Sequence, residues 1–517
     1  MSSTLILKMN ERYVDDQPVR RFLSLSGPAR IALLWTVLQG GLLSWLVHRQ
    51  LNGVGSSNWD LGIFTQATYE LARGSSFMSI RGMDILGHHF NVVLFALAPV
   101  SWLGGGAESL SIIQVWALVS GTAPAYLLGR DRIAPTLALH GPPGSAKTQA
   151  RWGLFASGIY LLHPAVTGLS WWMFHPETLA LAAVLWAWWF ALHKQWGLYA
   201  AAVLWVVLCR EDLSLAMVGF GVAVAVVFRR DRRAKAAGAV TVIGCLLFWG
   251  VVTQVVMPNR IGTNEPYYVT DFWGHLGSTM PEVIGTALKH PLASTEPLHG
   301  AAGAEFVTSL LAPTGALNLL SPITMLPAVP QLVAITLSND PDSRQIWHHH
   351  GALLLPFSIL SMIESLRWLR RRAPRLVRVW TPFACLSAVF SFLVMSPTVL
   401  GVHGDRWQPS DATGRALQAA VDRVPVNASV AATVTPANLL ADRSRVYTWP
   451  NPWMKWKRGY EFTELPNPDG VDYLVFKRKE LTTTNRDLAA KLTGSNGPFE
   501  VLSDAGGVVL ARRRTTR

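Results

Sequence analysis

Asp60 is the first carboxylate after the first long apolar run of this 517-residue chain, in the stretch SSNWDLGIFTQATYELARG at residues 56–74. Two interpretations fit its position. In the first, Asp60 is the N-cap of a short amphipathic helix through Leu61, Phe64, Thr68 and Leu71, because an Asp side chain accepts hydrogen bonds from first-turn amides. In the second, Asp60 is a carboxylate held at a membrane surface for chemistry. The two roles are compatible, and the local pattern leaves both open.

Other ionisable side chains gather in short segments beside apolar runs. In a membrane protein such residues are candidates for function, because their transfer into hydrocarbon is costly unless they are solvated or paired. A carboxylate in such a set can act as a base on an acceptor hydroxyl, while Arg or His side chains hold a lipid phosphate. The four groups are Asp60 with Asp84, His88 and His89; His175 with Glu177; Arg210, Glu211 and Asp212; and His348, His349 and His350.

Each group also has a purely structural interpretation. Pro176 followed by Glu177 is typical of a helix start, with Pro in the first turn and an acid at the positive end of the helix dipole. Glu211 and Asp212 fit the start of the next apolar run in the same way. The histidines are often packed or interfacial residues in proteins of this kind.

A metal site is a further alternative. Asp60, Asp84 or Asp212 could bind a divalent cation together with His88 or His175. No HExxH spacing occurs, and the three cysteines lie in apolar runs without a metal-binding spacing. The sequence therefore identifies no certain cofactor and leaves a divalent cation open.

The composition indicates the elements that position these residues. Half of the residues are hydrophobic, only 15% are charged and 22 are Trp, which exceeds what a soluble core needs. We therefore predict an α-helical polytopic membrane protein. The net charge of +13 does not call for a nucleic-acid partner, because Lys and Arg set the topology of membrane proteins. Runs of near-spanning length predict about eleven transmembrane helices, at residues 31–47, 109–128, 153–171, 177–193, 195–209, 212–228, 237–256, 304–320, 322–338, 351–368 and 379–399.

The basic clusters predict an orientation for these spans. A shorter run at residues 90–103 contains Pro99 and precedes three glycines, so we interpret it as re-entrant or interfacial, with a full span as the alternative. With residues 1–30 in the cytoplasm, most Lys and Arg before residue 400 then lie on the inner side. The membrane domain covers residues 31–400, with a first external loop at 48–108. All four ionisable groups then share the outer face.

The composition changes to that of a soluble domain after residue 400. Short strands and two helices predict a small α/β domain at residues 401–517, outside the cytoplasm. A segment at residues 140–147, HGPPGSAK, resembles only half of a phosphate-binding loop and has no strand before it. The predicted strands are Ser429–Thr433, Arg445–Trp449, Val471–Phe476 and Gly506–Ala511, and the helices are Ala412–Arg423 and Asn485–Leu492.

Several motifs carry a resemblance to a known family. In chain order they are NWDLGIFTQATYELARG, GHHFNVVLFALAP, FHPETLALAAVLWAWW, CREDLSLAMVGFG, LPAVPQLVAITLS and WHHHGALLLPF. They resemble the successive motifs of the bacterial DUF2079 membrane proteins over about residues 31–400, and the tail resembles the extracytoplasmic domain that commonly follows. That family is similar to the GT-C superfamily of polyprenyl-phosphate-dependent glycosyltransferases. The resemblance implies a multi-helix membrane domain whose first external loop carries the catalytic carboxylate, which is Asp60 by position.

The resemblance also exposes a difference. Many GT-C enzymes have paired acids in the first external loop, whereas Leu61 and Gly62 follow Asp60 here. The second acid must therefore come from elsewhere, and Asp84 is the nearest candidate in the loop.

These observations lead to one leading hypothesis. We expect a bacterial plasma-membrane glycosyltransferase that moves a hexosyl or pentosyl group from a polyprenyl-phosphate donor to an envelope glycan, lipid or protein acceptor at the outer face. The alternatives are a transporter or lipid flippase, and an envelope-binding protein anchored by the helical bundle. The expected catalytic acids are Asp60 as the base, with Asp84, Glu211 and Asp212, and the expected substrate-binding residues are His88, His89, His175, Glu177, Arg210, His348, His349 and His350.

Overall fold

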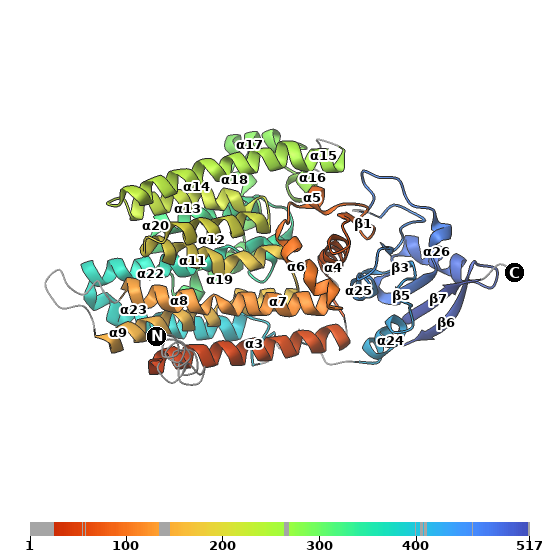
Figure 1. The fold of residues 1–517 in the computed structure, drawn as a ribbon, viewed down its shortest axis with the longest axis horizontal. Helices are drawn as coiled ribbons and strands as arrows, with labels where there is room; N and C mark the ends of the chain where they lie inside the picture. The colour runs from red at the N-terminus through yellow and green to blue at the C-terminus, as the bar shows by residue number, and fades with distance from the viewer. Residues whose placement is uncertain are drawn as a thin grey trace, which may run out of the picture.

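The computed structural model describes residues 25–53, 55–56, 58–133, 145–262, 268–398, 400–403, 407, 411–456 and 459–514. The chain is mostly helical, with a helical bundle at one end of its long axis and a β-sheet at the other (Figure 1). Residues 1–24 of the predicted cytoplasmic segment and residues 140–144 of the loop-like segment HGPPGSAK lie outside the described residues.

Five described helices are long and apolar enough to cross a membrane. They are the segments Gly27–Gly53, Ala107–Ile133, Arg232–Ile261, His349–Arg372 and Pro374–Met395. Five shorter apolar helices accompany them, at Val93–Trp102, Pro176–Leu192, Trp196–Cys209, Leu213–Val227 and Pro322–Thr336. Apolar helices of these lengths and in this number are typical of a multi-pass membrane protein. The number of eleven spans stays a prediction.

The helices of the bundle are joined mostly by short turns. Their bounds are α3 Gly27–Gly53, α4 Trp59–Leu71, α5 Ile85–His88, α6 Val93–Trp102, α7 Ala107–Ser120, α8 Thr122–Leu128, α9 Ala146–Leu162, α10 Pro164–Trp172, α11 Leu181–Leu192, α12 Trp196–Cys209, α13 Leu213–Val227, α14 Arg232–Val251, α15 Met257–Ile261, α16 Tyr268–Trp273, α17 Met280–Lys289, α18 Pro291–Ser294, α19 Ala301–Leu311, α20 Pro322–Met325, α21 Val329–Thr336, α22 Leu354–Arg372 and α23 Pro374–Met395.

Proline breaks three of the predicted spans into shorter pieces. The run at 153–171 divides at Pro164 into α9 and α10, because proline cannot donate a helical hydrogen bond. The run at 304–320 is α19 followed by two 3₁₀ turns, and the run at 322–338 is a series of short helices. The predicted non-crossing run forms α6, whose ten residues rise about 15 Å, half of the ~30 Å hydrocarbon thickness.

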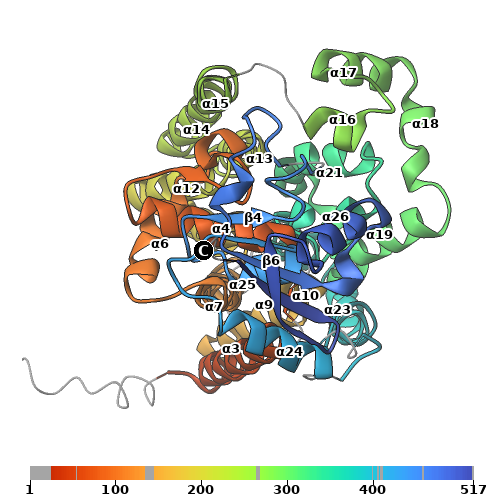
Figure 2. The same cartoon turned by 90° about the vertical axis from the view of Figure 1, so that its right-hand side faces the viewer.

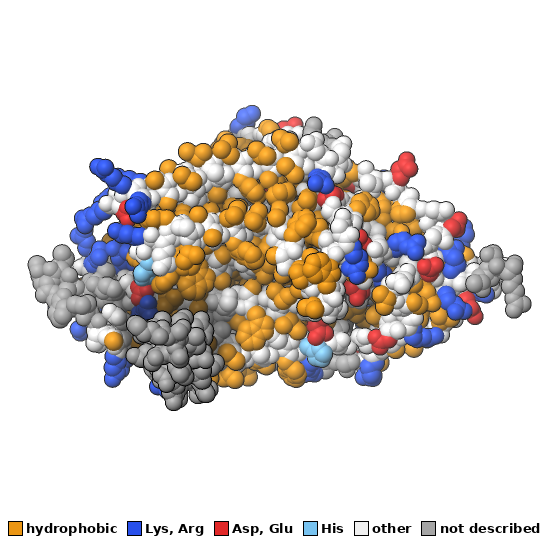
Figure 3. All heavy atoms as spheres, viewed as in Figure 1, with side chains coloured by type: hydrophobic (Ala, Val, Ile, Leu, Met, Phe, Trp, Pro, Cys, Tyr) orange, Lys and Arg blue, Asp and Glu red, His pale blue; other side chains and the backbone are white. Residues whose placement is uncertain are grey.

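The surface of the bundle is that of a protein surrounded by lipid. Large apolar side chains point outward over its length, with Leu38 71%, Val240 70% and Leu386 71% exposed. In Figure 3 these orange side chains cover the bundle, and Lys and Arg gather at its end away from the sheet. Basic residues at one end of an apolar belt are typical of membrane proteins.

Helix α4, which carries Asp60, differs from the predicted amphipathic helix. Ten of its thirteen residues are buried, including the polar Thr65, Gln66 and Thr68. The prediction of one solvated face is therefore wrong, because protein surrounds α4 on nearly all sides. A two-stranded hairpin of β1 (Phe77–Met78) and β2 (Met83–Asp84) follows it.

The C-terminal residues form a five-stranded mixed sheet of order β4-β3-β5-β7-β6. Strands β3, β4 and β5 are parallel, and β7 runs antiparallel to both β5 and β6. Figure 2 looks onto this end of the molecule, where α4 lies beside the sheet. The elements are α24 Ala412–Val421, β3 Val430–Ala432, α25 Val434–Leu439, β4 Val446–Thr448, β5 Tyr473–Lys477, α26 Thr483–Thr493, β6 Phe499–Ala505 and β7 Val508–Arg513.

Buried hydrogen bonds join the first loop to this sheet. Gln66 Nε2 on α4 donates to Ser79 Oγ at 2.8 Å and to the Arg443 carbonyl at 2.9 Å. The Tyr460 hydroxyl donates to the Ser79 carbonyl at 2.7 Å. Because these polar groups are buried, losing a partner costs more than the bond itself contributes. The loop and the sheet therefore form one packed unit.

Asn438 on α25 makes a second connection, directly to the start of α4. Its Nδ2 donates to the carbonyls of Ser56 at 2.7 Å and Asn58 at 2.8 Å. Gly62 permits this approach, because a Cβ there would lie 2.6 Å from Asn438 Oδ1. The C-terminal unit thus holds the residues that precede Asp60.

Candidate functional site

Asp60 lies in the first turn of α4, but it is not the N-cap. Asn58 has that position, with extended backbone angles, and its Oδ1 accepts from the Asp60 amide at 3.1 Å. The predicted capping role of Asp60 is therefore wrong by two residues. Its carboxylate instead projects beside the positive end of the helix dipole, which favours a negative charge.

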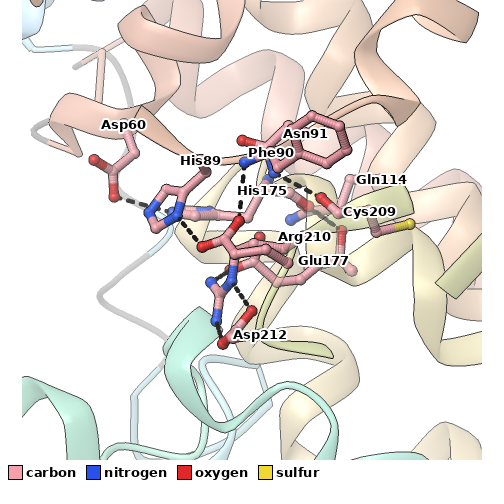
Figure 4. Close-up of polar contacts among 12 residues, drawn as sticks. Asp60, His89, Phe90, Asn91, Gln114, His175, Glu177, Cys209, Arg210 and Asp212 are labelled. Carbon is pink, nitrogen blue, oxygen red and sulfur yellow. Dashed lines mark hydrogen bonds and ion pairs between the residues drawn. The ribbon is translucent and has the colours of Figure 1, made fainter. Parts of the chain in front are cut away.

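The Asp60 carboxylate faces His175, which precedes the 3₁₀ turn Pro176–Ala180 (Figure 4). Asp60 Oδ2 lies 3.3 Å from His175 Nε2. The Asp60 side chain is 32% exposed, whereas that of His175 is only 2% exposed. The site thus combines an accessible carboxylate with an imidazole that the protein encloses.

Gln114 on α7 fixes the backbone around His175. Its Oε1 accepts from the His175 amide at 2.6 Å, and its Nε2 donates to the Met173 carbonyl at 2.6 Å. Met173 has φ 73° and ψ −174°, a region that residues other than glycine rarely adopt. Such strain persists only where surrounding contacts impose it, so the position of His175 is strongly determined.

The three consecutive histidines before α22 complete this side of the site. His349 stacks on His175 with ring centroids 4.0 Å apart, and His350 lies 4.0 Å from His349. His348 stacks on Trp172 at 3.9 Å. Histidines from two distant segments therefore surround the Asp60 carboxylate.

These neighbours set the charge of Asp60. Partial burial raises the pKa of Asp60, but the hydrogen bond with His175 and the charges of nearby imidazoles lower it by more. The net pKa of Asp60 lies well below its usual value. The carboxylate is therefore ionised at neutral pH.

Arg210 forms a second polar cluster, at the turn between α12 and α13 (Figure 4). Its Nε and Nη2 donate to the two Asp212 oxygens, each at 2.6 Å, and its Nη1 donates to Glu177 Oε1 at 2.5 Å. The Arg210 and Glu177 side chains are 9% and 2% exposed, whereas Asp212 is 45% exposed. Burial lowers the pKa of Arg210, but the two carboxylates raise it by more, so the guanidinium stays protonated.

Glu211 points away from Arg210 and binds the first loop. Its Oε1 lies 2.8 Å from His89 Nδ1, and its Oε2 accepts from the Phe90 amide at 2.9 Å. Burial lowers the pKa of His89, but Glu211 raises it by more, so the net pKa is raised. This pair connects two segments of the chain.

Asp84, the predicted second acid, is engaged elsewhere. Its Oδ1 accepts from the Leu86 amide at 2.7 Å as the N-cap of α5, and its Oδ2 accepts from Ser76 Oγ at 2.6 Å. Arg260 Nη1 also lies 3.4 Å from Oδ2. In the described residues Asp84 is therefore a capping residue, and the partners beside Asp60 are histidines.

The family described as "Predicted membrane protein (DUF2079)" matches residues 50–510. The chain belongs to the DUF2079 family. The matched region contains Asp60, both polar clusters, four strands of the C-terminal sheet and the first half of β7. No protein with a curated description matches this DUF2079 protein.

Two solved structures show a low level of similarity to this DUF2079 protein. The crystal structure of ArnT from Cupriavidus metallidurans in the apo state has 11% identity and a TM-score of 0.47, covering 93% of this chain and 98% of that chain. The structure of ArnT from Cupriavidus metallidurans bound to undecaprenyl phosphate has 14% identity and a TM-score of 0.46, covering 94% and 98%.

Two residues that position the site, Asn58 and Gln114, are absent from the predicted set. Asn58 could be identified from its place before an apolar helical run, which is an N-cap signal. Gln114 lies inside a long apolar helix, and no local pattern connects it to His175, 61 residues further on. Only the folded chain shows that it holds the imidazole in place.

Proposed function

We propose that this DUF2079 protein is a membrane glycosyltransferase that uses a polyprenyl-phosphate sugar as donor, with Asp60 as the base. The observation that carries the proposal is the ionised Asp60 carboxylate, 32% exposed at the start of a buried helix and fixed by His175. A base in this position is accessible to a substrate hydroxyl, while the surrounding protein keeps its geometry constant.

The chemistry is a single displacement at the anomeric carbon of the donor sugar. The acceptor hydroxyl oxygen forms a bond to that carbon while the bond to the phosphate oxygen breaks. Asp60 takes the hydroxyl proton, and polyprenyl phosphate leaves with the bonding electron pair. Because the pKa of Asp60 is lowered, the carboxylate accepts the proton only as the hydroxyl oxygen becomes acidic during bond formation.

The donor phosphate needs positive charge, and Arg210 is the one arginine among the expected site residues, with a buried guanidinium. Asp212 occupies two of its N–H donors but is 45% exposed, whereas Glu177 is enclosed. A phosphate presents the same paired oxygens as a carboxylate and could replace Asp212 on Arg210. Glu177 would then hold Arg210 in place during the exchange, and the imidazoles of His348, His349 and His350 would donate further hydrogen bonds.

The proposal includes the orientation predicted from the basic clusters, with the site and the C-terminal sheet outside the cytoplasm. The Lys and Arg side chains at the opposite end of the bundle support it (Figure 3). An accessible tag after residue 514 in intact cells would agree with this orientation. A tag that becomes accessible only after lysis would contradict it.

The test of function is sugar transfer in proteoliposomes, supplied with polyprenyl-phosphate hexose or pentose and an envelope extract as acceptor. We expect Asp60→Asn to lower the transfer rate by about 10²- to 10⁴-fold, the range for a general base. Asp84→Asn is the matched control, because Asp84 is an acid of the same loop that caps α5. Equal activity of Asp60→Asn and the unsubstituted protein would contradict the proposal.

A further inference from the structure

We propose that Asp60, His175 and His349 form a binding site for one divalent transition-metal ion. Each residue offers one ligand atom, and these atoms lie within 4.8 Å of one another. They come from α4, from the segment before the 3₁₀ turn and from the turn before α22, which are far apart in the sequence. The use of the ion in sugar transfer rests on the proposed function, whereas its binding does not.

The hydrogen bonds of His175 leave one ring nitrogen directed at the site. His175 Nδ1 lies 3.2 Å from the Met173 carbonyl, which can only accept, so we infer that Nδ1 carries the hydrogen. With a hydrogen on Nδ1, a hydrogen bond from Nε2 to Asp60 Oδ2, 3.3 Å away, needs a second ring hydrogen on Nε2. A metal ion bound between these two atoms would take the place of that hydrogen. Metal-binding histidines commonly donate their other N–H to a carbonyl in this way.

His349 has a polar atom that the protein leaves without a partner. Its Nδ1 is buried and has no hydrogen bond among the described residues. An unpaired buried nitrogen is costly, which is why such groups usually have a structural or ligand-binding reason. The ring also lies nearly parallel to that of His175, with an angle of 14° between the two ring planes.

Binding requires the three side chains to move closer together. Ligand atoms around a tetrahedral zinc ion lie about 3.4 Å apart, because each bond is about 2.0–2.1 Å long and the bonds meet at about 109°. The present spread of 4.8 Å would therefore shrink by about 1.4 Å, which rotation of the side chains can supply. Gln114 and Asn58 hold the backbone at two of the three ligands, so the site is largely arranged before an ion enters.

The ligand types indicate which ions the site prefers and how it is used. Two imidazoles with one carboxylate suit Zn²⁺ or Mn²⁺, whereas Mg²⁺ and Ca²⁺ prefer oxygen ligands. Three protein ligands leave at least one position open, as in catalytic rather than structural metal sites. One carboxylate also neutralises only half of the charge of a divalent ion. The remaining positive charge would attract a phosphate or polarise a hydroxyl at the exposed edge of Asp60.

The experiment measures metal binding by the purified full-length protein in lipid nanodiscs. The protein is stripped with a chelator, dialysed against micromolar Zn²⁺ or Mn²⁺, and its metal content is determined by mass spectrometry. We expect one ion per chain, and at least a tenfold loss of affinity in His349→Ala. The matched control is His350→Ala, which removes the adjacent histidine outside the three-ligand group and should keep one ion.

A second measurement uses only the unsubstituted protein, so it does not depend on whether the variants fold. Co²⁺ bound to the unsubstituted protein should give the visible absorption of a nitrogen- and oxygen-ligated ion. No stoichiometric binding, or equal binding by His349→Ala and His350→Ala, would overturn the site. Stoichiometric binding without sugar transfer would support the site and contradict the proposed function. Full sugar transfer by the metal-free protein would overturn the catalytic use of the ion. The metal-binding measurements alone would then show whether the site exists.

Discussion

Two carboxylates, Glu364 and Asp60, have opposite surroundings. Glu364 on α22 is 5% exposed and accepts from Arg132 at 2.5 Å, Arg367 at 3.1 Å and Trp188 at 3.4 Å. Asp60 is 32% exposed, and His175 is the partner of its Oδ2 in the described residues. A carboxylate whose oxygens are all engaged stabilises the fold, whereas one with free acceptor capacity is available to a substrate or an ion.

The largest expected effect is a difference in the free energy of unfolding between variants of Glu364 and Asp60. Glu364→Ala leaves the buried Arg132 guanidinium without its counter-charge, which costs about 3–5 kcal/mol. Asp60→Ala should change the free energy of unfolding by less than ~1 kcal/mol, because its surroundings stay solvated. Both values can be measured by titrating the protein in mixed micelles with sodium dodecyl sulfate. Equal losses for the two variants would show that Asp60 is also a structural residue.

The next largest effect tests whether the contact between Asn438 and the segment before α4 positions Asp60. Asn438→Ala removes two hydrogen bonds to the segment before α4 and leaves two buried carbonyls without these donors. We expect transfer to fall about 10- to 100-fold in kcat, because small displacements of a reacting group have effects of this size. Asn467→Ala, in an exposed turn of the C-terminal unit, is the control.

Gly62→Ala tests the same contact from the other side. The new Cβ would meet Asn438 Oδ1, so kcat should fall in the same direction as for Asn438→Ala. If both variants keep full activity while Asp60→Asn is inactive, the sheet does not position the site.

The smallest effect is a dependence of stability on pH at the His89–Glu211 pair. The pKa of His89 is raised in the folded protein, so the pair contributes its full stability below pH ~6.5 and loses it as pH rises through the folded pKa. His89→Gln should therefore cost up to ~1 kcal/mol near pH 6 and nearly nothing near pH 9. Unfolding titrations at the two pH values measure this, and Glu211→Gln should show the same loss of pH dependence.

Much of the fold could be predicted because it depends on local composition. Apolar runs indicate the bundle, and strands β3, β4, β5 and β7 lie within or beside their predicted ranges. Strand β6 is missed because its residues, FEVLSDA, are mostly polar and exposed. The broken helices after α19 are missed because an apolar run does not show how its prolines divide it.

The site could be predicted only in part. The predicted topology and the family resemblance lead to Asp60 as the expected base, and they predict that the histidines lie on the same side of the membrane. They do not show which groups meet, because Asp60 and His175 are 115 residues apart and only packing brings them together. This is why Asp84, close in sequence, is the expected second acid, whereas His349 is the residue that reaches the site.

The hydrogen bonds between the first loop and the C-terminal sheet set an order of events during synthesis. Gln66 emerges early, but its Arg443 partner is 377 residues further along the chain. Until the ribosome has made that segment and it has reached the same side of the membrane, the buried amide of Gln66 lacks this acceptor. The hydrogen bonds that connect α4 to the C-terminal unit can therefore form only after this segment has been made, and a polypeptide released earlier would insert its helices without them.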